Sequence, residues 1–239
     1  MSRKTELILA LDADTAAQAR SLAAAVGERL QWVKVGKQLF TREGPALIGE
    51  LREKYGKKVF LDLKFHDIPN TVEQAVRAAA AIGAEMVNVH AAGGFSMLQA
   101  AARAARENHL TLLAVTVLTS LDADELRETG IDCRPEEQVL RLTRLAGRAG
   151  VDGVVCSARE IAPLRQSMPR EFRLLTPGIR PAGDDCHDQK RVMTPGQATR
   201  AGADYLVVGR PISQAPNPAA AVAAILREME TAQLPETAV

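Results

Sequence analysis

Eight short runs of apolar, β-prone residues alternate with segments of helical spacing along the chain. Most of these runs are almost continuously apolar, which is typical of strands covered on both faces of a sheet. They occupy residues 7–12, 31–36, 58–64, 86–91, 111–119, 153–158, 173–179 and 205–210. Such alternation predicts a parallel sheet, and eight strand–helix units in 239 residues predict a (β/α)8 (TIM) barrel.

The segments between the runs carry helix-start signals. Asn70 and Glu73 predict a capping box, whereas Thr194-Pro195 and Asn217-Pro218 each predict an N-cap followed by proline at the first helical position. A doubly wound open sheet is the alternative architecture, but no G-x-G-x-x-G follows the first run. Because the chain has no linker or low-complexity segment, residues 1–239 are expected to form a single domain.

Composition narrows the function classes. The net charge is +1, charged residues of both signs make up 25% of the chain, and aromatic residues only 3%, which argues against nucleic-acid and membrane-surface binding. The three scattered cysteines, Cys133, Cys156 and Cys186, favour free thiols in a reducing cytosol and lack metal-ligand spacing. The first apolar run is too short for a signal sequence, and no run spans a membrane, so a cytoplasmic protein is expected.

A barrel places its catalytic groups at the carboxyl ends of its strands. Almost every expected strand here finishes in a polar or conformationally special residue, and the amino-terminal ends show no comparable set. In chain order these residues are Asp12, Lys34, Asp62 with Lys64, His90, Thr119, Ser157, Thr176 with Pro177, and Gly209-Arg210. The distribution predicts an active site at this end of the sheet, with His90 interpreted as a hydrogen-bonded supporting residue.

The stretch FLDLKFHDIPNT, residues 60–71, places charges at the end of an otherwise buried strand. Residues two apart on a strand point to the same side, so Asp62 and Lys64 should project together. Lys34 on the neighbouring strand is expected at the same mouth, and Asp67 lies in the following turn. Such a Lys/Asp cluster keeps its members ionised near neutral pH. A structural salt-bridge network at the rim is the alternative interpretation.

Asp62, Lys64 and Asp67 form D-x-K-x-x-D, the signature of the orotidine 5'-phosphate decarboxylase superfamily. The chain resembles the bacterial orotidine 5'-phosphate decarboxylases over nearly its whole length. The matching motifs are LALD, KVGKQLF, FLDLKFHDIPNTV, MVNVHAAGG, AVTVLTS, DGVVCSA, TPGIRP, RVMTPGQA and YLVVGRPI. The resemblance implies a homodimer with active sites at the subunit interface. It also implies cofactor-free and metal-free decarboxylation of orotidine 5'-phosphate to uridine 5'-phosphate.

The resemblance further implies roles for individual residues. Lys64 resembles the proton donor to C6 of the pyrimidine. Lys34, Asp62 and Asp67 resemble the rest of the charged network at the substrate, with Asp67 supplied by the partner subunit. The other implied substrate contacts are Asp12 and Thr71 at the ribose (Thr71 from the partner subunit), Thr119 on the pyrimidine side, and Arg180, Gln189, Gly209 and Arg210 on the phosphate and lid side.

Barrels of this kind commonly bind phosphate with the loops after strands seven and eight. Here those loops carry TPGIRP, which includes Pro177, and VGRP. Gly209 lets a backbone N–H approach an oxygen, and Arg210 offers a bidentate fork. The polar segment 180–191 predicts a lid, with Gln189 near its end placed to bridge phosphate and pyrimidine. A solvated arginine and an ordinary hydrophilic loop are the simpler interpretations.

Two other functions remain open. The first is a metal-dependent lyase or epimerase of the same superfamily that acts on a ketose phosphate. The resemblance places an acidic metal ligand at the end of the second strand in that branch, where this chain has Lys34, whose cation would repel a metal. The second is a non-catalytic phosphosugar-binding barrel. It would keep Gly209 and Arg210 but has no need for the Lys/Asp cluster.

Overall fold

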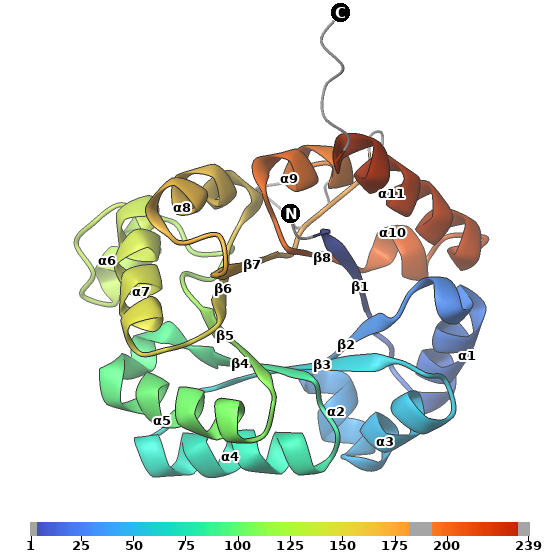
Figure 1. Ribbon diagram of the computed structural model, residues 1–239, viewed down its shortest axis with the longest axis horizontal. Helices are drawn as coiled ribbons and strands as arrows, with labels where there is room; N and C mark the ends of the chain where they lie inside the picture. The colour runs from blue at the N-terminus through green and yellow to red at the C-terminus, as the bar shows by residue number, and fades with distance from the viewer. Residues whose placement is uncertain (1–3, 182–192, 234–239) are drawn as a thin grey trace, which may run out of the picture.

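The computed structural model describes residues 4–181 and 193–233. Within these ranges, eight parallel strands pair in chain order, and the last strand pairs with the first to close a barrel. Figure 1 shows the ring of strands with the helices arranged around it. The predicted (β/α)8 architecture is confirmed, and the open doubly wound sheet is excluded.

The observed strands agree with the eight predicted runs, most closely where each strand begins. The run predicted at 111–119 extends four residues beyond the strand, which ends at Val115. There the chain has left the ladder, and the Thr116 hydroxyl donates to the Val155 carbonyl at 3.1 Å. The strands are β1 (Glu6–Ala10), β2 (Trp32–Gly36), β3 (Lys58–Phe65), β4 (Met86–His90), β5 (Thr111–Val115), β6 (Gly153–Val155), β7 (Arg173–Thr176) and β8 (Tyr205–Val208).

Two of the three predicted helix starts are confirmed. Thr194 caps its helix by accepting from the Gln197 N–H, and Asn217 accepts from the Ala220 N–H at 3.0 Å. The helices are α1 (Ala16–Val26), α2 (Lys37–Glu43), α3 (Ala46–Glu53), α4 (Pro69–Ala81), α5 (Gly94–Glu107), α6 (Ala123–Glu128), α7 (Pro135–Arg148), α8 (Ile161–Ser167), α9 (Pro195–Ala201), α10 (Arg210–Ser213) and α11 (Pro218–Gln233).

The predicted capping box at Asn70 and Glu73 is wrong. Proline occupies the first helical position of α4 as Pro69, and Ile68 is the N-cap without a side-chain hydrogen bond. Because the fixed φ of proline suits the first helical position, the helix begins earlier than the capping pattern suggested. Asn70 therefore lies inside the first turn.

The core has an inner and an outer layer. Inside the barrel, Trp32, Phe60 and Tyr205 belong to one buried cluster, and the Trp32 and Tyr205 rings meet edge-on with centroids 5.9 Å apart. The outer layer fills the space between the strands and the helices and contains Leu61. Phe60 and Leu61 thus show the alternation expected of a strand covered on both faces.

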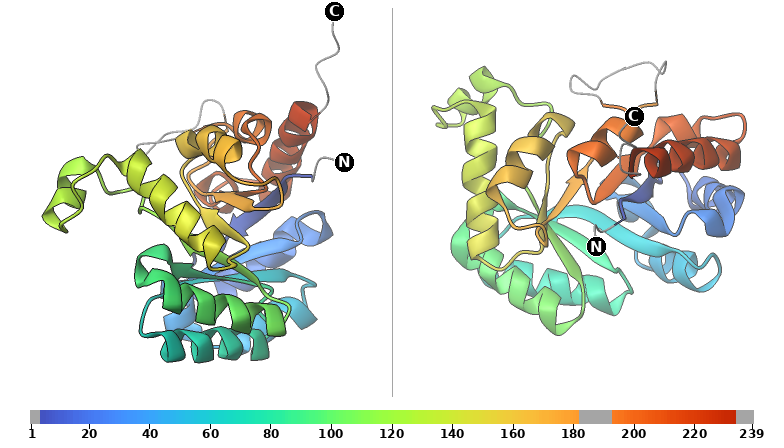
Figure 2. Two further views of the ribbon diagram at one scale, coloured as in Figure 1. Left: turned by 60° about the vertical axis from the view of Figure 1, so that its left-hand side comes forward. Right: turned by 45° about the horizontal axis from the view of Figure 1, so that its top comes forward.

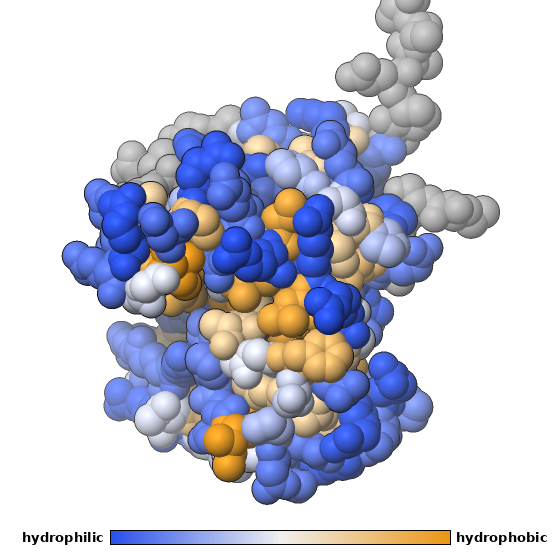
Figure 3. All heavy atoms as spheres, turned by 90° about the vertical axis from the view of Figure 1, so that its left-hand side faces the viewer, coloured by the Kyte–Doolittle hydropathy of each residue, from blue (hydrophilic) through white to orange (hydrophobic). Residues whose placement is uncertain are grey.

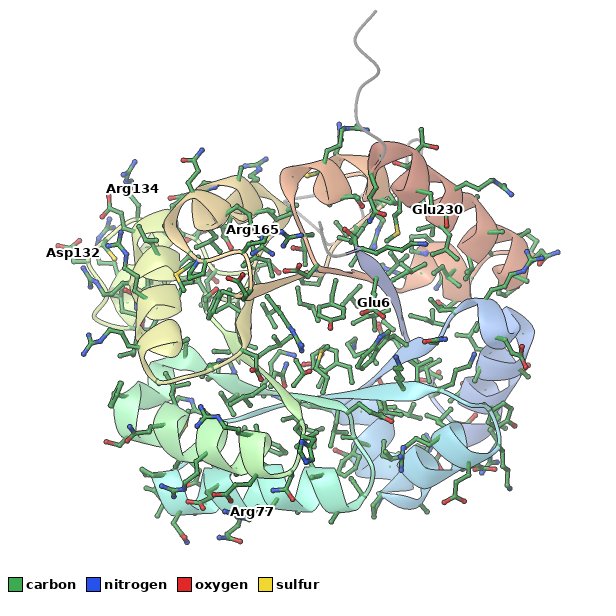
Figure 4. The ribbon with its side chains drawn as sticks, in the orientation of Figure 1. Glu6, Arg77, Asp132, Arg134, Arg165 and Glu230 are labelled. Atoms are coloured by element: carbon green, nitrogen blue, oxygen red, sulfur yellow. The ribbon has the colours of Figure 1, made fainter. Side chains whose placement is uncertain are left out.

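Polar contacts also occupy the amino-terminal end of the barrel. From the sequence alone, we found no comparable set of polar residues at the amino-terminal ends of the strands. Trp32 Nε1 donates to Glu6 Oε2 at 2.8 Å, and Arg165 of α8 forms an ion pair with the buried Asp204 (Figure 4). Arg173 at the start of β7 donates to the hydroxyl of Thr111. These groups satisfy one another and pack against the core, so they are structural.

Figure 2 shows α6 standing out from the barrel, at the end of the molecule away from the N-terminus. This helix follows β5, so it extends the rim around the carboxyl ends of the strands. In the described ranges, no helix is both long and apolar enough to cross a membrane.

Candidate active site

Four charged side chains meet at the carboxyl ends of the first three strands. Lys34 Nζ lies 3.2 Å from Asp12 Oδ1 and 3.4 Å from Asp62 Oδ2. Lys64 Nζ lies 2.5 Å from Asp62 Oδ1. The result is a chain of alternating charge, Asp12–Lys34–Asp62–Lys64, which we call the charged cluster. The structure thus brings together three of the four predicted catalytic residues and one predicted ribose contact.

The local backbone around Lys64 is irregular, unlike the regular strand that the sequence suggested. Leu61 pairs with Val87 of β4, but the next pair along the two strands is Phe65 with Val89. Three residues of β3 therefore stand opposite one residue of β4, which defines a β-bulge. Lys64 has a φ of 54°, which non-glycine residues seldom adopt. The position of Lys64 beside Asp62 is therefore set by this bulge, although simple alternation would also have placed the two residues on one face.

Asn88 is a site residue that the sequence reasoning missed. It is the residue of β4 opposite the bulge, and its side chain is buried. Its Oδ1 accepts from the Lys64 N–H at 2.8 Å, and its Nδ2 donates to Asp62 Oδ1 at 2.7 Å. One signal was present: Asn88 is a polar residue inside the apolar run MVNVH, two positions before His90 and so on the same face.

The charged cluster keeps Asp62 ionised. Burial alone would raise the pKa of this carboxyl, but the charges of Lys34 and Lys64 and the donors of Lys64 and Asn88 outweigh it. The pKa of Asp62 therefore lies below its ordinary value. The Asp62 carboxylate is thus held between two lysine side chains in a largely enclosed position.

Three cavities open from the charged cluster: a third, of about 210 Å³ and lined by Gly36 and Gln38, lies toward α2, and the other two adjoin each other. The inner cavity, of about 190 Å³, is lined by the charged cluster residues Lys34, Asp62 and Lys64, by Asn88 and Thr119, and otherwise by mainly apolar side chains. The side cavity, of about 440 Å³, lies toward the ends of β1, β7 and β8. Lys34, Asp62 and Pro177 line both. Together the inner and side cavities suit an elongated ligand with one flat, largely apolar end and one polar end.

The predicted binding residues divide between the inner and side cavities. Thr119 lines the inner cavity. The side cavity is lined by Asp12, Arg180, Gly209 and Arg210. Thr119 and the residues predicted on the phosphate side therefore line different cavities, and Lys34 and Asp62 of the charged cluster line both.

Three predicted residues do not join this arrangement within the chain. Asp67 is exposed, and its carboxylate accepts from the Ile68 N–H at 2.6 Å. Thr71 is exposed on the first turn of α4. Neither lines the inner or the side cavity within the described residues. Gln189 lies outside the described residues.

His90 and Cys156 border the site without joining the charged cluster. The His90 and His66 rings lie 5.5 Å apart between centroids. Burial, followed by the nearby His66 and lysine charges, lowers the pKa of His90, which favours the neutral ring. Cys156 lines the inner cavity, and burial raises the pKa of its thiol to about 12. A thiol with this pKa stays protonated and behaves as a small apolar side chain.

Comparison with known proteins decides the family. Residues 5–225 match the Orotidine 5'-phosphate decarboxylase / HUMPS family. The chain belongs to the orotidine 5'-phosphate decarboxylase family. It is 54% identical over 228 residues to the orotidine 5'-phosphate decarboxylase of Halorhodospira halophila, covering 95% of this chain and 96% of that protein. Its identity to the Marinomonas sp. orotidine 5'-phosphate decarboxylase is 52% over 223 residues, covering 92% and 94% of the two chains.

A solved structure of the orotidine 5'-phosphate decarboxylase from Lactobacillus acidophilus superposes with a TM-score of 0.85 at 39% identity, covering 95% of this chain and 99% of that one. A conserved protein from Geobacillus kaustophilus superposes with a TM-score of 0.82 at 36% identity, covering 93% and 99%. Membership of the orotidine 5'-phosphate decarboxylase family therefore rests on sequence and fold together.

Proposed function

We propose that this enzyme converts orotidine 5'-phosphate to uridine 5'-phosphate and CO2 without a cofactor, as one catalytic barrel of the cytoplasm. The observation that carries the proposal is the order of charges at the floor of the inner and side cavities. Lys34, Asp62 and Lys64 alternate there with separations of 3.4 and 2.5 Å. Family membership at about 50% identity supports the same reaction.

The shapes of the inner and side cavities fit the parts of this substrate. The inner cavity, with Phe60, Val115 and Leu175 in its wall, has the apolar lining that a flat pyrimidine requires. The side cavity, with Arg180, Gly209 and Arg210, offers the guanidinium groups and backbone approach that a phosphate requires. The ribose would then lie between them, beside Asp12 and Lys34.

Lys64 performs the proton transfer in this proposal. The bond from C6 of the pyrimidine to the carboxylate carbon breaks, CO2 leaves, and the electron pair stays on C6. The Lys64 ammonium stabilises this developing negative charge and then gives C6 a proton, so a C–H bond forms. The neutral Lys64 amine regains a proton from solvent before the next turnover.

In this proposal, Asp62 also repels the carboxylate of the bound substrate before the reaction. Its carboxylate faces the inner cavity beside Lys64, where the substrate carboxylate would have to lie. Two unit charges about 4 Å apart repel by roughly 4 kcal/mol at an effective dielectric near 20. The repulsion falls as neutral CO2 departs, and binding of the remote phosphate offsets it in the bound substrate. Asp62→Ala should therefore lower kcat more than it weakens substrate binding. Equal losses in both would rule out this account.

A second copy of the chain is proposed to complete the site with its Asp67 and Thr71. Large apolar side chains are exposed after three successive strands: Ile68 (66% exposed) after β3, Phe95 (37%) after β4 and Leu118 (39%) after β5. Figure 3 shows that the flank toward α6 and α7 also presents an apolar area between hydrophilic surfaces. Exposed apolar surface beside a site favours contact with another chain.

Subunit exchange tests this shared site. Lys64→Ala and Asp67→Ala dimers should each be inactive, and mixing them should restore up to about one quarter of the wild-type activity, because one site of the mixed dimer is then intact. The Asp67→Ala variant mixed with itself is the control. If mixed dimers form but stay inactive, the two residues do not act across an interface.

The metal-dependent alternative is disfavoured by the place of Lys34. Its ammonium lies between Asp12 and Asp62 and neutralises the two carboxylates that a divalent ion would otherwise use. A non-catalytic phosphosugar-binding barrel would not need the enclosed ion pair between Asp62 and Lys64.

The decisive experiment follows the ultraviolet absorbance of orotidine 5'-phosphate with the pure protein in excess chelator, beside Lys64→Ala. Conversion by the wild type and none by the variant is the expected result. Activity on a ketose phosphate that returns only with a divalent metal would overturn the proposal. Equal conversion by Lys64→Ala would keep the activity but remove Lys64 as proton donor.

A further inference from the structure

Asn88, a polar residue on the inner face of β4, is almost fully buried, with a relative exposure of 1% for the whole residue. Buried amides in barrels need partners for both ends of the side chain, because an unpaired buried polar group is costly. Asn88 finds both partners in the charged cluster: the Lys64 N–H and the Asp62 carboxylate. No other described residue is shown bonding both to the backbone of Lys64 and to the side chain of Asp62.

The two partners leave Asn88 one orientation. The Lys64 N–H only donates, so it must face the amide oxygen at 2.8 Å. The ionised Asp62 carboxylate only accepts, so it must face the amide nitrogen at 2.7 Å. An amide presents a donor and an acceptor side by side on a short stem, whereas a carboxylate or an aliphatic side chain of this size does not. The residue type is therefore matched to its two neighbours.

The contact with Lys64 supports a strained backbone. Lys64 has a φ of 54° within the bulge, and a non-glycine residue in this region persists only when its surroundings hold it there. The Asn88 oxygen receives the backbone N–H at this point of the interrupted ladder. Without it, β3 could relax toward regular pairing, and the backbone of Lys64 would move away from the position that now sets its side chain beside Asp62.

The contact with Asp62 fixes the rotation of its carboxylate. Oδ1 accepts from both Lys64 Nζ and Asn88 Nδ2, which leaves Oδ2 toward Lys34 at 3.4 Å. One side chain thus sets both the direction of Lys64 and the plane of Asp62. Small errors in such placement are costly to catalysis.

We infer that Asn88 is a positioning residue for the decarboxylation. Its two hydrogen bonds hold the bulge at Lys64 and the carboxylate of Asp62 in fixed positions relative to each other. The inference rests on the proposed function for its effect on turnover, but its structural content stands on the two hydrogen bonds. Asn88 lines the inner cavity beside Asp62 and Lys64 but not the side cavity, so its proposed effect lies at the reacting end of the substrate and not at the phosphate.

The test compares Asn88→Ala with Thr116→Val. Thr116 also lies buried at the mouth, one residue after the adjacent β5, and its hydroxyl bonds to Val155 rather than to the charged cluster. Asn88→Ala should lower kcat by about 10²-fold and leave KM almost unchanged, because misplacement affects the transition state more than remote binding. Thr116→Val should keep its kcat despite a similar loss of a buried hydrogen bond.

A second measurement does not depend on activity. The carboxyl carbon of Asp62 is followed by 13C NMR against pH in aspartate-labelled protein, with Asp62→Asn identifying its resonance. Lys34, Lys64 and Asn88 face this carboxylate, and Asp12 reaches it through Lys34. Loss of the Asn88 donor should move the Asp62 titration to higher pH, since that hydrogen bond favours the ionised form.

These measurements distinguish a failure of the Asn88 inference from a failure of the proposed function. A wild-type kcat and an unmoved titration in Asn88→Ala would overturn the inference, as would an equal loss of kcat in Thr116→Val. A wild type that leaves orotidine 5'-phosphate unchanged would defeat the proposed function alone, and the titration would still decide the role of Asn88. If Asn88→Ala does not fold, Asn88→Leu keeps the size and the neutral charge but lacks the donor to Asp62, so a titration shift in the same direction is expected.

Discussion

Lys34 reaches Asp62 past a glycine. In the ladder between β2 and β3, the Cα of Lys34 pairs with Phe60, and it is Gly36 that pairs with Asp62. The Lys34 side chain nevertheless brings its Nζ to 3.4 Å from Asp62 Oδ2. A Cβ on Gly36 would lie 3.3 Å from that Nζ, which is tighter than most real contacts. The absence of a side chain at Gly36 thus gives the ammonium its room.

Gly36→Ala should therefore impair catalysis without harming the fold. Gly36 has φ −90° and ψ 178°, an extended conformation that alanine adopts freely, so backbone strain is not introduced. The methyl group would displace the Lys34 ammonium by a few tenths of an ångström, and we expect kcat/KM to fall about tenfold. Initial rates and a thermal melt of the same sample check both parts.

Gly49→Ala is the matched control for that substitution. A Cβ at Gly49 meets nothing within 4 Å, and the residue lies within α3. The change should leave kcat/KM unaltered and stabilise the protein by about 0.5–1 kcal/mol, as alanine does in place of glycine inside a helix. A loss of activity in both variants would show that the Gly36 effect is not specific to Lys34.

Lys34→Ala should do more damage than Gly36→Ala. It leaves Asp12 and Asp62 without the cation between them, so kcat/KM at pH 7 should fall by at least about 10²-fold. The charge of Lys34 is the largest influence that lowers the pKa of Asp62, so the acid limb of the pH–rate profile should move to higher pH. Lys54→Ala, which loses only an exposed pair with Glu50, should change neither property.

Acid should destabilise the fold partly through His90. Its pKa is lower in the folded protein than the value of about 6.5 expected for the unfolded chain. The unfolded state therefore binds the proton more readily, and the contribution of His90 to stability is complete above about pH 6.5 and lost as the pH falls through its folded pKa. Urea midpoints at pH 7 and pH 5.5 should differ more in the wild type than in His90→Gln. Equal differences would contradict the assignment.

Cys156 should resist alkylation although it lines the inner cavity. Its thiol has a pKa of about 12 and is buried, so almost no thiolate is present at pH 8. Mass spectrometry after iodoacetamide treatment should find Cys156 unmodified in the native protein and modified after denaturation. Cys133, which is partly exposed, should react more readily in the native state. Rapid native modification of Cys156 would show that the cavity wall opens.

The sequence predicted the barrel because the relevant signal is local. Each strand is a short apolar run, such as YLVV at Tyr205–Val208, and each needs only its own residues to be recognised. The same holds for the mouth: Asp12, Lys34 and Asp62 could be grouped because parallel strands bring their carboxyl ends to one edge.

Asn88 could not be assigned in the same way, because its role depends on the neighbouring strand. Nothing in MVNVH reveals that β3 has a bulge opposite it, and nothing in FLDLKF reveals a positive φ at Lys64. A regular strand would also have placed Asp62 and Lys64 on one face, so the expected contact was correct while the backbone behind it was not. Register irregularities arise from pairing across strands, which single-strand patterns do not encode.

The predicted start of α4 was wrong for a different reason. Two local signals competed, the Asn70 capping pattern and the Pro69 preference for the first helical position, and proline prevailed. Ile68 is left as an exposed N-cap without a side-chain bond, beside Asp67.

The pairing of β1 with β8 also constrains how the chain reaches its native state. Glu6 lies in register with Tyr205, so β1, the first strand of the barrel in chain order, can fill one of its edges only after β8 has been synthesised. During synthesis that edge is open to pairing with other nascent chains. The closure of the ring is thus a long-range event, and pairing between strands so far apart in the sequence is intrinsically slow.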